Sequence, residues 1–388
     1  MKKKLLFVIE SLRAAGAEKS LITFLSVLDY SRFEVDLQLF SYGGEFERYI
    51  PKEVNLLPPF KYVQYLEKPV FSNIRMLIAR IGYSASIRFG DLSIKSKARK
   101  YWKHISPCIE MNPKQYDVAI AYGQCQPTFY ICDKVTATKK IGWVNCIYHL
   151  EGFEKKYQYN FYKSLDKIVL VSDAAYNHFL NVYPDISKKM TIILDMMDRS
   201  TIEQLSLVEN SFNDNYRGIR LLTVARLDKR DKGYDISLEA CKILRDRGIA
   251  FKWYAIGRGT YKEEIEKYIA ENHLEKTFIL LGTTPNPYPY IKDATLYVQT
   301  SRHEGYGLSI AEARILNTPV VTTEFDAVYN QMVQGKNGLV VPQDPIAVAD
   351  AVEKLLSDKA LYQSIVAYQQ LEKKGNSEEI EKFYKLII

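Results

Sequence analysis

Residues 294–313 read ATLYVQTSRHEGYGLSIAEA, and this stretch contains one complete structural unit. Its first seven residues are mostly apolar, β-branched or aromatic, which predicts a short buried strand. Gly305 and Gly307 then free the backbone to turn, and the residues that follow predict the start of a helix. A strand, a short glycine-containing loop and a helix, in this order, predict an α/β domain with a parallel sheet.

The same unit recurs through the second half of the chain. Further strands are expected within residues 219–227, 250–257, 278–282 and 318–324, and helices within 232–248 and 260–273. This spacing is typical of a doubly wound, Rossmann-like domain, in which ligands bind at the carboxyl ends of the strands.

The first half shows the pattern as well. Apolar runs predict strands within residues 3–12, 33–41, 116–123, 139–145 and 166–172, and residues 13–28 predict a helix. Residues 200–218 are polar and irregular, as expected for a linker. We therefore expect an N-terminal Rossmann-like domain at 1–200, a second one at 201–370 and a terminal helix at 371–388 that packs back on a domain. Two such domains would face a central cleft, where ligands usually bind.

The composition is that of a globular protein of the cytoplasm. The 388 residues suffice for two cores, with 47% hydrophobic and 26% charged residues. No apolar run reaches the roughly 20 residues that cross a bilayer. The apolar start is short and is interrupted by Glu10, so we expect a buried strand rather than a secretion signal. Five cysteines without CxxC spacing predict reduced thiols and no metal site.

Residues 60–103 combine basic and apolar side chains, although the net charge of the chain is only +7. A basic amphipathic segment of this kind can bind an anionic membrane surface. We favour such a peripheral contact over a pair of solvated helices, and both over nucleic-acid binding. The basic residues are Lys61, Lys68, Arg75, Arg80, Arg88, Lys95, Lys97, Arg99, Lys100 and Lys103, and the aromatic ones are Phe60, Tyr62, Tyr65, Phe71, Tyr83, Phe89, Tyr101 and Trp102.

Loops at the strand ends of the second half carry the candidate site. Arg226 follows a strand and Lys232 precedes a helix, so the two cations can hold a diphosphate without a metal, although surface cations are common in any protein. Gly257 begins a glycine turn that lacks the third glycine of a nicotinamide-binding fingerprint. Gly282 ends a strand, and the Pro- and Tyr-rich residues after it form either a wall for a nucleobase or a plain connection.

Glu304 and Glu312 lie on either side of a loop that suits anions, because a helix start carries partial positive charge. Carboxylates repel phosphate, so this pair makes sense only if it faces uncharged hydroxyl groups. A nucleotide-sugar, with a central diphosphate and hydroxyl-rich rings at both ends, satisfies both features. Either acid alone is explained more simply as a helix cap or a solvated residue. The loop between them consists of Gly305, Tyr306, Gly307 and Leu308.

In combination and order, these motifs resemble the retaining family 4 glycosyltransferases, also called group 1 glycosyl transferases. The matching stretches are VARLDKRDKGYD, IGRG, EGYGLSIAEA, TPVV and NGLVV in the second half and ESLRAAGAEKSL in the first. The resemblance implies the GT-B fold, in which two Rossmann-like doubly wound domains face a central cleft. It also implies a hexosyltransferase that needs neither a metal nor another cofactor.

The resemblance further implies roles for single residues. Arg226 and Lys232 would neutralise the departing diphosphate, Glu304 would hold hydroxyls of the donor sugar, and Glu312 would hold the ribose. The remaining donor-binding positions would be Gly16, Ala17, Gly257, Gly282, Gly305, Tyr306, Gly307 and Leu308.

The chain departs from the family pattern at a few positions. Many relatives carry a catalytic histidine after the strand that ends in Trp, where this chain has Asn145, and the nearby His149 is the candidate substitute. Asp195 stands where an asparagine is frequent, and Asn317 where a glycine is common before TPVV. The first two departures concern the catalytic details, whereas the third concerns a turn.

The sequence therefore predicts transfer of a sugar from a nucleoside diphosphate, UDP on family frequency, to a hydroxyl with retention of the anomeric configuration. The acceptor is expected to be a glycan or a lipid-linked acceptor in the synthesis of capsule, exopolysaccharide or lipopolysaccharide at the inner face of the membrane. Two alternatives stay open: a non-catalytic pseudoenzyme that assists a partner transferase, and a nucleotide-sugar epimerase.

Overall fold

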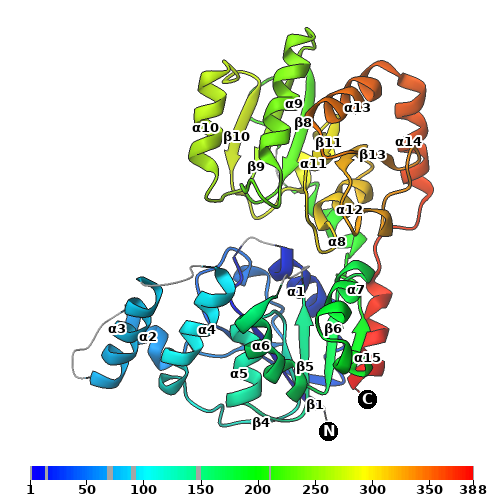
Figure 1. Cartoon of the computed structure of the whole chain (residues 1–388). Coiled ribbons are helices and arrows are strands. Elements are labelled where there is room, and N and C mark those ends of the chain that lie inside the picture. Colours follow the sequence, from blue (N-terminus) through cyan, green and yellow to red (C-terminus); the bar gives the residue numbers. More distant parts are fainter. Residues whose placement is uncertain are drawn as a thin grey trace. The chain divides into compact units, whose positions relative to one another are not determined.

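The computed structural model describes residues 2–13, 16–67, 73–88, 93–145, 150–208 and 211–387. The chain forms two compact units, each with its own parallel sheet (Figure 1). Unit 1 comprises residues 1–194 and 378–388, and unit 2 comprises residues 195–377. The predicted limits at residues 200 and 370 lie within unit 2.

Unit 1 is built around seven parallel strands in the order β3-β2-β1-β4-β5-β6-β7. Residues 5–9 of the central strand β1 are all buried, as expected for a parallel strand covered on both faces. The strands are β1 (Lys3–Ile9), β2 (Phe33–Leu39), β3 (Val54–Leu56), β4 (Gln115–Ala121), β5 (Thr136–Val144), β6 (Lys167–Leu170) and β7 (Met190–Ile192).

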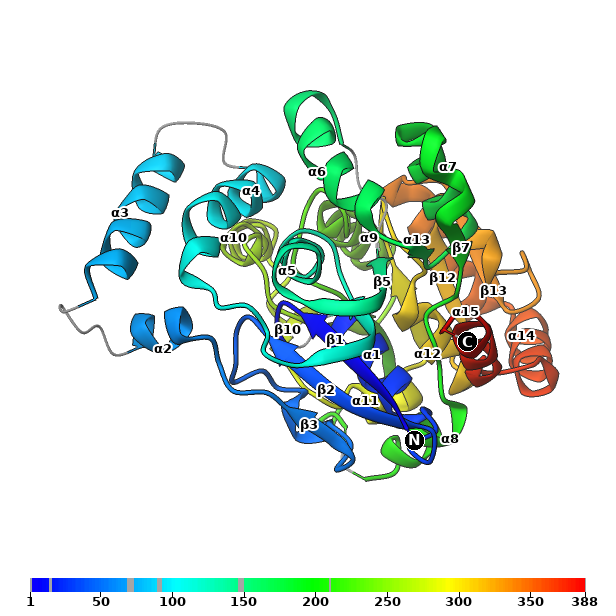
Figure 2. The same cartoon turned by 90° about the horizontal axis from the view of Figure 1, so that it is seen from below.

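Helices cover both faces of this sheet. Phe7 of β1 packs on Phe24 of α1 and Phe383 of α15, with ring centroids 5.5 and 6.2 Å apart. Its neighbours Leu6 and Val8 belong to the core cluster of the other face, on which α4, α5 and α6 gather (Figure 2). The helices of unit 1 are α1 (Gly16–Ser26), α2 (Lys61–Glu67), α3 (Ile74–Arg88), α4 (Ile94–Ile105), α5 (Gln126–Lys134), α6 (Gly152–Ser164), α7 (Asp173–Val182) and α15 (Ile380–Ile387), with short 3₁₀ turns at Glu47–Tyr49, Ser106–Cys108 and Pro184–Lys189.

Unit 2 has six parallel strands in the order β10-β9-β8-β11-β12-β13. The chain order reverses between β8 and β11, which is the point in a doubly wound sheet where ligands usually bind. The strands are β8 (Ile219–Val224), β9 (Phe251–Ile256), β10 (Phe278–Gly282), β11 (Leu296–Gln299), β12 (Val320–Thr323) and β13 (Gly338–Val341). The helices are α8 (Arg199–Leu205), α9 (Tyr234–Asp246), α10 (Lys262–Glu271), α11 (Tyr288–Asp293), α12 (Leu308–Ile315), α13 (Pro345–Ser357) and α14 (Lys359–Leu371), and 3₁₀ turns lie at Val328–Asn330 and Ser377–Glu379.

Two helices lie where the sequence predicted irregular chain. Helix α8 occupies part of the expected linker, because Asp198 caps it by accepting a hydrogen bond from the Thr201 amide at 2.9 Å and Ile202 is buried. Helix α11 occupies the Pro- and Tyr-rich stretch after Gly282, where Tyr288 and Pro289 are buried. A proline fits the first turn of a helix, which explains why this stretch is helical. Its role as a wall for a nucleobase stays a prediction.

The chain ends on unit 1. The ammonium group of Lys3 donates a hydrogen bond to the carbonyl oxygen of Ile387 at 2.9 Å, and the hydroxyl of Tyr384 accepts one from the Asp29 amide at 2.9 Å. Together with the Phe383 contacts, these bonds hold α15 against the same face as α1. Within the ranges given above, no helix combines the length and the apolar character needed to cross a membrane.

Candidate functional site

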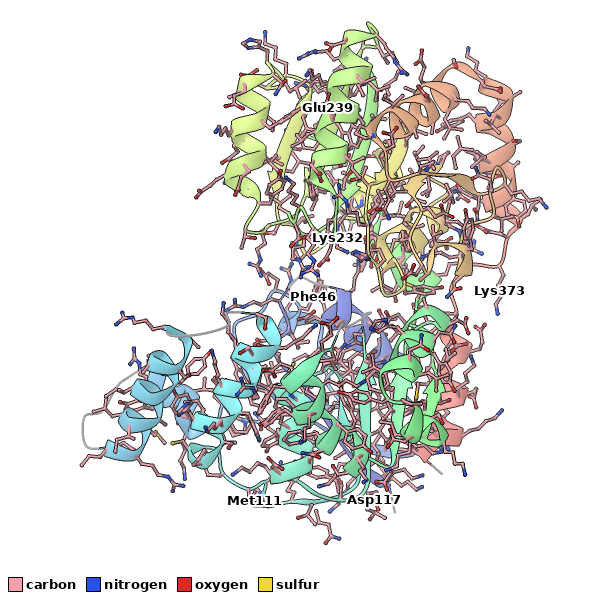
Figure 3. The ribbon with its side chains drawn as sticks, viewed as in Figure 1. Phe46, Met111, Asp117, Lys232, Glu239 and Lys373 are labelled. Atoms are coloured by element: carbon pink, nitrogen blue, oxygen red, sulfur yellow. The ribbon has the colours of Figure 1, made fainter. Side chains whose placement is uncertain are left out.

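The predicted site residues of the second half lie at the ends of β8, β9, β10 and β11 or in the loops after them, except for Leu308 and Glu312, which belong to helix α12. Because these strands run parallel, their carboxyl ends share one edge of the sheet, so the loops are neighbours. Lys232 lies just before the first residue of α9 at this edge, whereas Glu239 lies farther along the helix (Figure 3).

The two predicted cations lie in the loop after β8, and each is paired with a carboxylate. The Lys232 ammonium lies 2.7 Å from Glu304 Oε1, and their side chains are 18% and 10% exposed. Arg226 lies 3.3 Å from Asp231, and this pair is much more open, at 58% and 38%. Lys232 is therefore held in a mostly buried ion pair, whereas the Arg226 guanidinium reaches toward solvent and can rearrange at little cost.

Glu304 is fixed by three donors on a single oxygen. Its Oε1 accepts hydrogen bonds from Lys232 at 2.7 Å, from Ser301 Oγ at 2.7 Å and from Gln299 Nε2 at 2.5 Å. All hydrogen bonds that Glu304 accepts within the described part of the chain end on this oxygen. The carboxylate therefore keeps Oε2 available to hydroxyl groups of a ligand.

The loop after β8 is tied to the loop after β11. The amides of Arg302 and His303 donate to the Asp231 carbonyl at 2.7 and 3.2 Å, and Thr300 Oγ1 donates to the Gly233 carbonyl at 2.9 Å. Gly233 has a φ of 61°, and a Cβ at this position would lie 2.1 Å from the Thr300 carbonyl oxygen. Only glycine allows this close approach, which brings Lys232 beside Glu304.

A bidentate ion pair joins the loop after β11 to helix α9. The Arg302 guanidinium donates to both carboxylate oxygens of Asp235, at 2.8 and 2.9 Å. Burial raises the pKa of Asp235, but the hydrogen bonds and charge of Arg302 outweigh this effect and hold the pKa below its usual range. Asp235 is therefore ionised at neutral pH and anchors the loop that carries Glu304.

The glycine turn after β9 packs tightly on the loop after β8. A Cβ on Gly257 would lie 2.0 Å from the Ala225 carbonyl oxygen, and the Gly257 amide donates to the Gly282 carbonyl at 2.7 Å. Gly282 itself is exposed, and a Cβ there would meet no atom within 4 Å. Gly257 thus lets two loops meet, and Gly282 leaves open space at the end of β10.

Helix α12 begins directly after the glycine loop. Gly307 precedes Leu308 with a φ of 86°, and its carbonyl oxygen accepts a hydrogen bond from Gln331 Nε2 at 3.1 Å. Glu312 lies within α12 and is only 1% exposed. Burial raises the pKa of Tyr297 well above its usual value, and the charges of Glu312 and Glu304 act in the same direction. The two predicted carboxylates therefore both lie near Tyr297. Gly305 and Tyr306 complete the loop.

The predicted residues of the first half lie in unit 1. Gly16 and Ala17 form the first turn of α1. Asn145 directly follows β5 and donates to the Tyr122 carbonyl at 3.3 Å, while its Oδ1 is buried without a hydrogen-bond partner among the described residues. His149 lies outside the described residues.

The two remaining departures from the family pattern, Asn317 and Asp195, both take part in hydrogen bonds within unit 2. Asn317 adopts a φ of 60°, which explains why glycine is also suited to this turn. Its side-chain oxygen accepts a hydrogen bond from Lys374 at 2.5 Å. Asp195 is 6% exposed, and its carbonyl oxygen accepts a hydrogen bond from Asn376 at 3.0 Å.

Sequence reasoning missed the residues that hold the site together. Gln299 and Ser301, 3% and 0% exposed, bind Glu304, and Asp231 and Arg302 link the two loops. Polar residues at the end of an apolar strand are the signal that indicates the first two. Among the described residues as a whole, no group of three or more His, Cys, Asp or Glu side chains is arranged to hold a metal ion.

Residues 209–372 match the family model for glycosyl transferases group 1. The chain is 33% identical over 134 residues to a poly(ribitol-phosphate) α-N-acetylglucosaminyltransferase of Staphylococcus aureus, which covers 34% of this chain and 27% of the relative. It is also 24% identical over 324 residues to the N-acetylgalactosamine-N,N'-diacetylbacillosaminyl-diphospho-undecaprenol 4-α-N-acetylgalactosaminyltransferase of Campylobacter jejuni. This match covers 83% of this chain and 81% of the relative. The chain spans about a quarter to a half of the length of the first curated relatives it matches.

Among solved structures, a variant of Staphylococcus aureus TarM in complex with fondaparinux, α-GlcNAc-glycerol and UDP has the same fold. The TM-score is 0.71 at 16% identity, over 99% of both chains. The predicted GT-B fold is thereby confirmed, and the predicted family resemblance is confirmed for the second half of the chain.

Proposed function

We propose that the protein is a retaining glycosyltransferase, because residues 209–372 match the family model for glycosyl transferases group 1. It moves a sugar from a nucleoside diphosphate to an acceptor hydroxyl. The observation that carries this proposal is the Lys232–Glu304 pair at the ligand-binding edge of unit 2. It places a cation 2.7 Å from a carboxylate that can accept hydrogen bonds from sugar hydroxyls.

The donor would lie along the carboxyl ends of β8 to β12. Lys232 uses one N–H on Glu304, so its other two can bind phosphate oxygens, and Arg226 can leave Asp231 to form a forked contact with the same diphosphate. The amides at the start of α12 add partial positive charge. Glu304 Oε2 would accept hydrogen bonds from the sugar, and Glu312 from the ribose.

Catalysis would be mainly electrostatic. Negative charge develops on the departing diphosphate, and preorganised cations and amides stabilise it more in the transition state than in the bound donor. We assign no covalent nucleophile. In a front-face reaction, the bond from the anomeric carbon to the phosphate oxygen breaks, and the acceptor oxygen forms a bond to the anomeric carbon on the same face. The departing phosphate takes the proton of the acceptor hydroxyl. Arg226 and Lys232 supply the charge that a metal would otherwise supply.

The donor is expected to be a UDP-sugar, since UDP is bound in the related TarM structure. A screen of UDP-, GDP- and ADP-sugars with mass-spectrometric detection of product tests this. Transfer or donor hydrolysis with any of them supports a transferase. Nucleotide binding by calorimetry without turnover under any acceptor would instead favour the pseudoenzyme, and interconversion of free UDP-sugars would favour the epimerase.

The acceptor is expected to be a glycan or lipid-linked glycan at the cytoplasmic face of the membrane, and helix α3 supports the membrane part of this proposal. Ile74, Ile78 and Ile81 follow a helical spacing, and they are 66%, 64% and 58% exposed. The opposite side of α3 carries the buried Met76 and Ala79. An exposed row of isoleucines on a helix packed by its other side is typical of an interfacial helix.

Charge favours an anionic lipid surface as the partner of α3. Residues 73–88 and 93–105 contain no Asp or Glu, while α3 alone carries Arg75, Arg80 and Arg88. Four aromatic residues of the predicted basic segment do not form this surface, because Phe60, Tyr62, Tyr65 and Trp102 are buried. Phe71 and Phe89 lie outside the described residues. Insertion of each isoleucine would contribute about 1–2 kcal/mol, and each arginine near the lipid about 1 kcal/mol.

Sedimentation with vesicles tests this contact. We expect the native protein to bind phosphatidylglycerol-containing vesicles and the Ile74→Ser, Ile78→Ser, Ile81→Ser triple variant to lose most of this binding. The matched control replaces Leu207 and Val208, which are 72% and 66% exposed in unit 2, by serine. Equal binding by the triple variant and the native protein would contradict the contact. If light scattering showed that the triple variant has a different oligomeric state from the native protein, the three isoleucines would form a protein interface instead.

A further inference from the structure

A chain of buried polar side chains leads from the interior of unit 2 to Lys232. Strand β11 is buried throughout, yet it carries Tyr297 and Gln299, which are 0% and 3% exposed, and Ser301 just beyond it is 0% exposed. Burying polar groups is costly unless they form hydrogen bonds. The partners of these three side chains therefore indicate what the polar groups are for.

The hydrogen bonds run in one direction along this chain. The hydroxyl of Tyr297 donates to Gln299 Oε1 at 2.5 Å, and Gln299 Nε2 donates to Glu304 Oε1 at 2.5 Å and to Ser301 Oγ at 3.0 Å. A carboxylate can only accept, so the NH₂ group of Gln299 must face Glu304. Tyr297 then satisfies the amide oxygen, and the amide of Gln299 is locked in this orientation.

The locked amide determines how Glu304 is presented. With Gln299, Ser301 and Lys232 all on Oε1, the carboxylate cannot rotate without breaking three hydrogen bonds. The position of Glu304 Oε1 therefore determines the position of the Lys232 ammonium, which donates a hydrogen bond to it. The NH₂ group and the oxygen of the Gln299 amide already have partners within the protein, so Gln299 acts through Glu304 rather than on a ligand.

We propose that Tyr297 and Gln299 are positioning residues for sugar transfer, and that they act by orienting Glu304 and, through it, the ammonium group of Lys232. This inference rests on the proposed function, in which Lys232 stabilises the departing diphosphate. A misplacement of a catalytic group by about 1 Å can cost about 10² in rate. The loss should fall mainly on kcat, because the interaction matters most in the transition state.

The substitution Gln299→Met tests the positioning role, because it keeps the length of the side chain and removes its hydrogen bonds. We expect kcat to fall by about 10–10², with a smaller change in the KM for the donor. Tyr297→Phe is the milder second variant if Gln299→Met fails to fold. It removes only the hydroxyl that orients the amide, and we expect a smaller loss of kcat in the same direction.

A pH profile separates positioning from a general structural role. Gln299→Glu would place a second carboxylate beside Glu304, with Lys232, Tyr297 and Glu312 as the other titratable groups nearby. Two adjacent carboxylates cannot both ionise easily, so the pair would retain a proton at higher pH. With that proton, the introduced side chain and Glu304 can again share a hydrogen bond, as Gln299 and Glu304 do in the native protein. The rate of this variant relative to the native protein should therefore rise as pH falls from 8 to 6, by up to about tenfold per pH unit.

Gln369→Met is the matched control. Gln369 is also a fully buried glutamine of unit 2, and its amide donates to the carbonyls of Thr318 and Asn337 at 3.2 and 2.9 Å, outside the site. We expect it to lower the melting temperature as Gln299→Met does and to leave kcat unchanged. Equal losses of kcat in both variants, or a pH profile of Gln299→Glu parallel to the native one, would overturn the proposal.

Failure of the proposed function is distinguishable from failure of this inference. If the native protein turns over no donor, the transferase proposal fails, and the positioning role is then judged by the affinity for UDP measured by calorimetry. Weaker binding by Gln299→Met than by Gln369→Met supports it. Native affinity in Gln299→Met would show that Lys232 does not depend on Gln299.

Discussion

Lys232 is the single side chain on which the proposed chemistry depends most. Its ammonium lies 2.7 Å from Glu304 and its side chain is 18% exposed, so the ammonium is preorganised rather than free. We expect Lys232→Ala to lower kcat/KM by about 10²–10³, the usual loss for one well-placed donor in the transition state. The control is Lys262→Ala on α10, whose side chain is 58% exposed in a surface pair. A native rate for Lys232→Ala in a steady-state assay would contradict the role.

Two glycines with similar backbone angles test the close packing of the loop after β8 on the loop after β11. Gly233 and Gly248 have φ values of 61° and 78°, but only Gly233 faces a neighbour, the Thr300 carbonyl, at 2.1 Å from its would-be Cβ. Gly248→Ala should cost about 1–2 kcal/mol of unfolding free energy from backbone strain alone. Gly233→Ala should cost clearly more and also reduce turnover, because the loop with Lys232 is pushed away. Equal losses in urea unfolding would count against this packing.

The link between the loop after β11 and helix α9 predicts a pH dependence of stability. The pKa of Asp235 is lowered in the folded protein, so its pair with Arg302 stabilises the fold above the ordinary carboxylate pKa of about 4 and is lost as pH falls through the folded value. Arg302→Met should therefore lower the free energy of unfolding by about 1–3 kcal/mol at pH 7 and by less at pH 3.

The control for this pair is Lys267→Met. Lys267 forms a surface pair with Glu271 at 3.8 Å, and both side chains are more than half exposed. It should leave the unfolding free energy nearly unchanged at both pH values. If the gap between Arg302→Met and the native protein were the same at pH 7 and pH 3, the pair would not be the cause of the stabilisation.

Regular elements were predictable where apolar periodicity was strong. Strands such as β8, β9 and β11 are largely buried, so their sequences are mostly apolar. Helices α8 and α11 were missed because they are short and directly follow Asp198 and Pro287, residues that also mark turns. Their helical state depends on the burial of Ile202 and Ile291, which no local pattern reveals.

Across the whole chain, motif order predicted the fold and the loops of unit 2, but not the network that orders them. The spacing of Lys232 and Glu304 in sequence gives no distance, and their pairing follows from strand order and from the close contact at Gly233. The exposed isoleucines of α3 were also missed, because the interpretation relied on the basic and aromatic residues of the same segment, and four of the aromatic ones are buried.

Independence from metal follows if Arg226 and Lys232 supply all the charge that the diphosphate needs. We expect the transfer rate to be the same in EDTA as in its absence, measured with the donor that the screen identifies. A rate that falls in EDTA and is restored by Mg²⁺ or Mn²⁺ would mean that a divalent cation shares this task.

The central claim is that unit 2 grips a diphosphate through Lys232 and Arg226. The most direct measurement is a crystal structure of the protein with UDP. We predict that the diphosphate lies at the carboxyl ends of β8 and β11, within hydrogen-bond distance of the Lys232 ammonium and the Arg226 guanidinium, with the ribose at Glu312. UDP bound elsewhere, with these three side chains making no contact to it, would contradict the account.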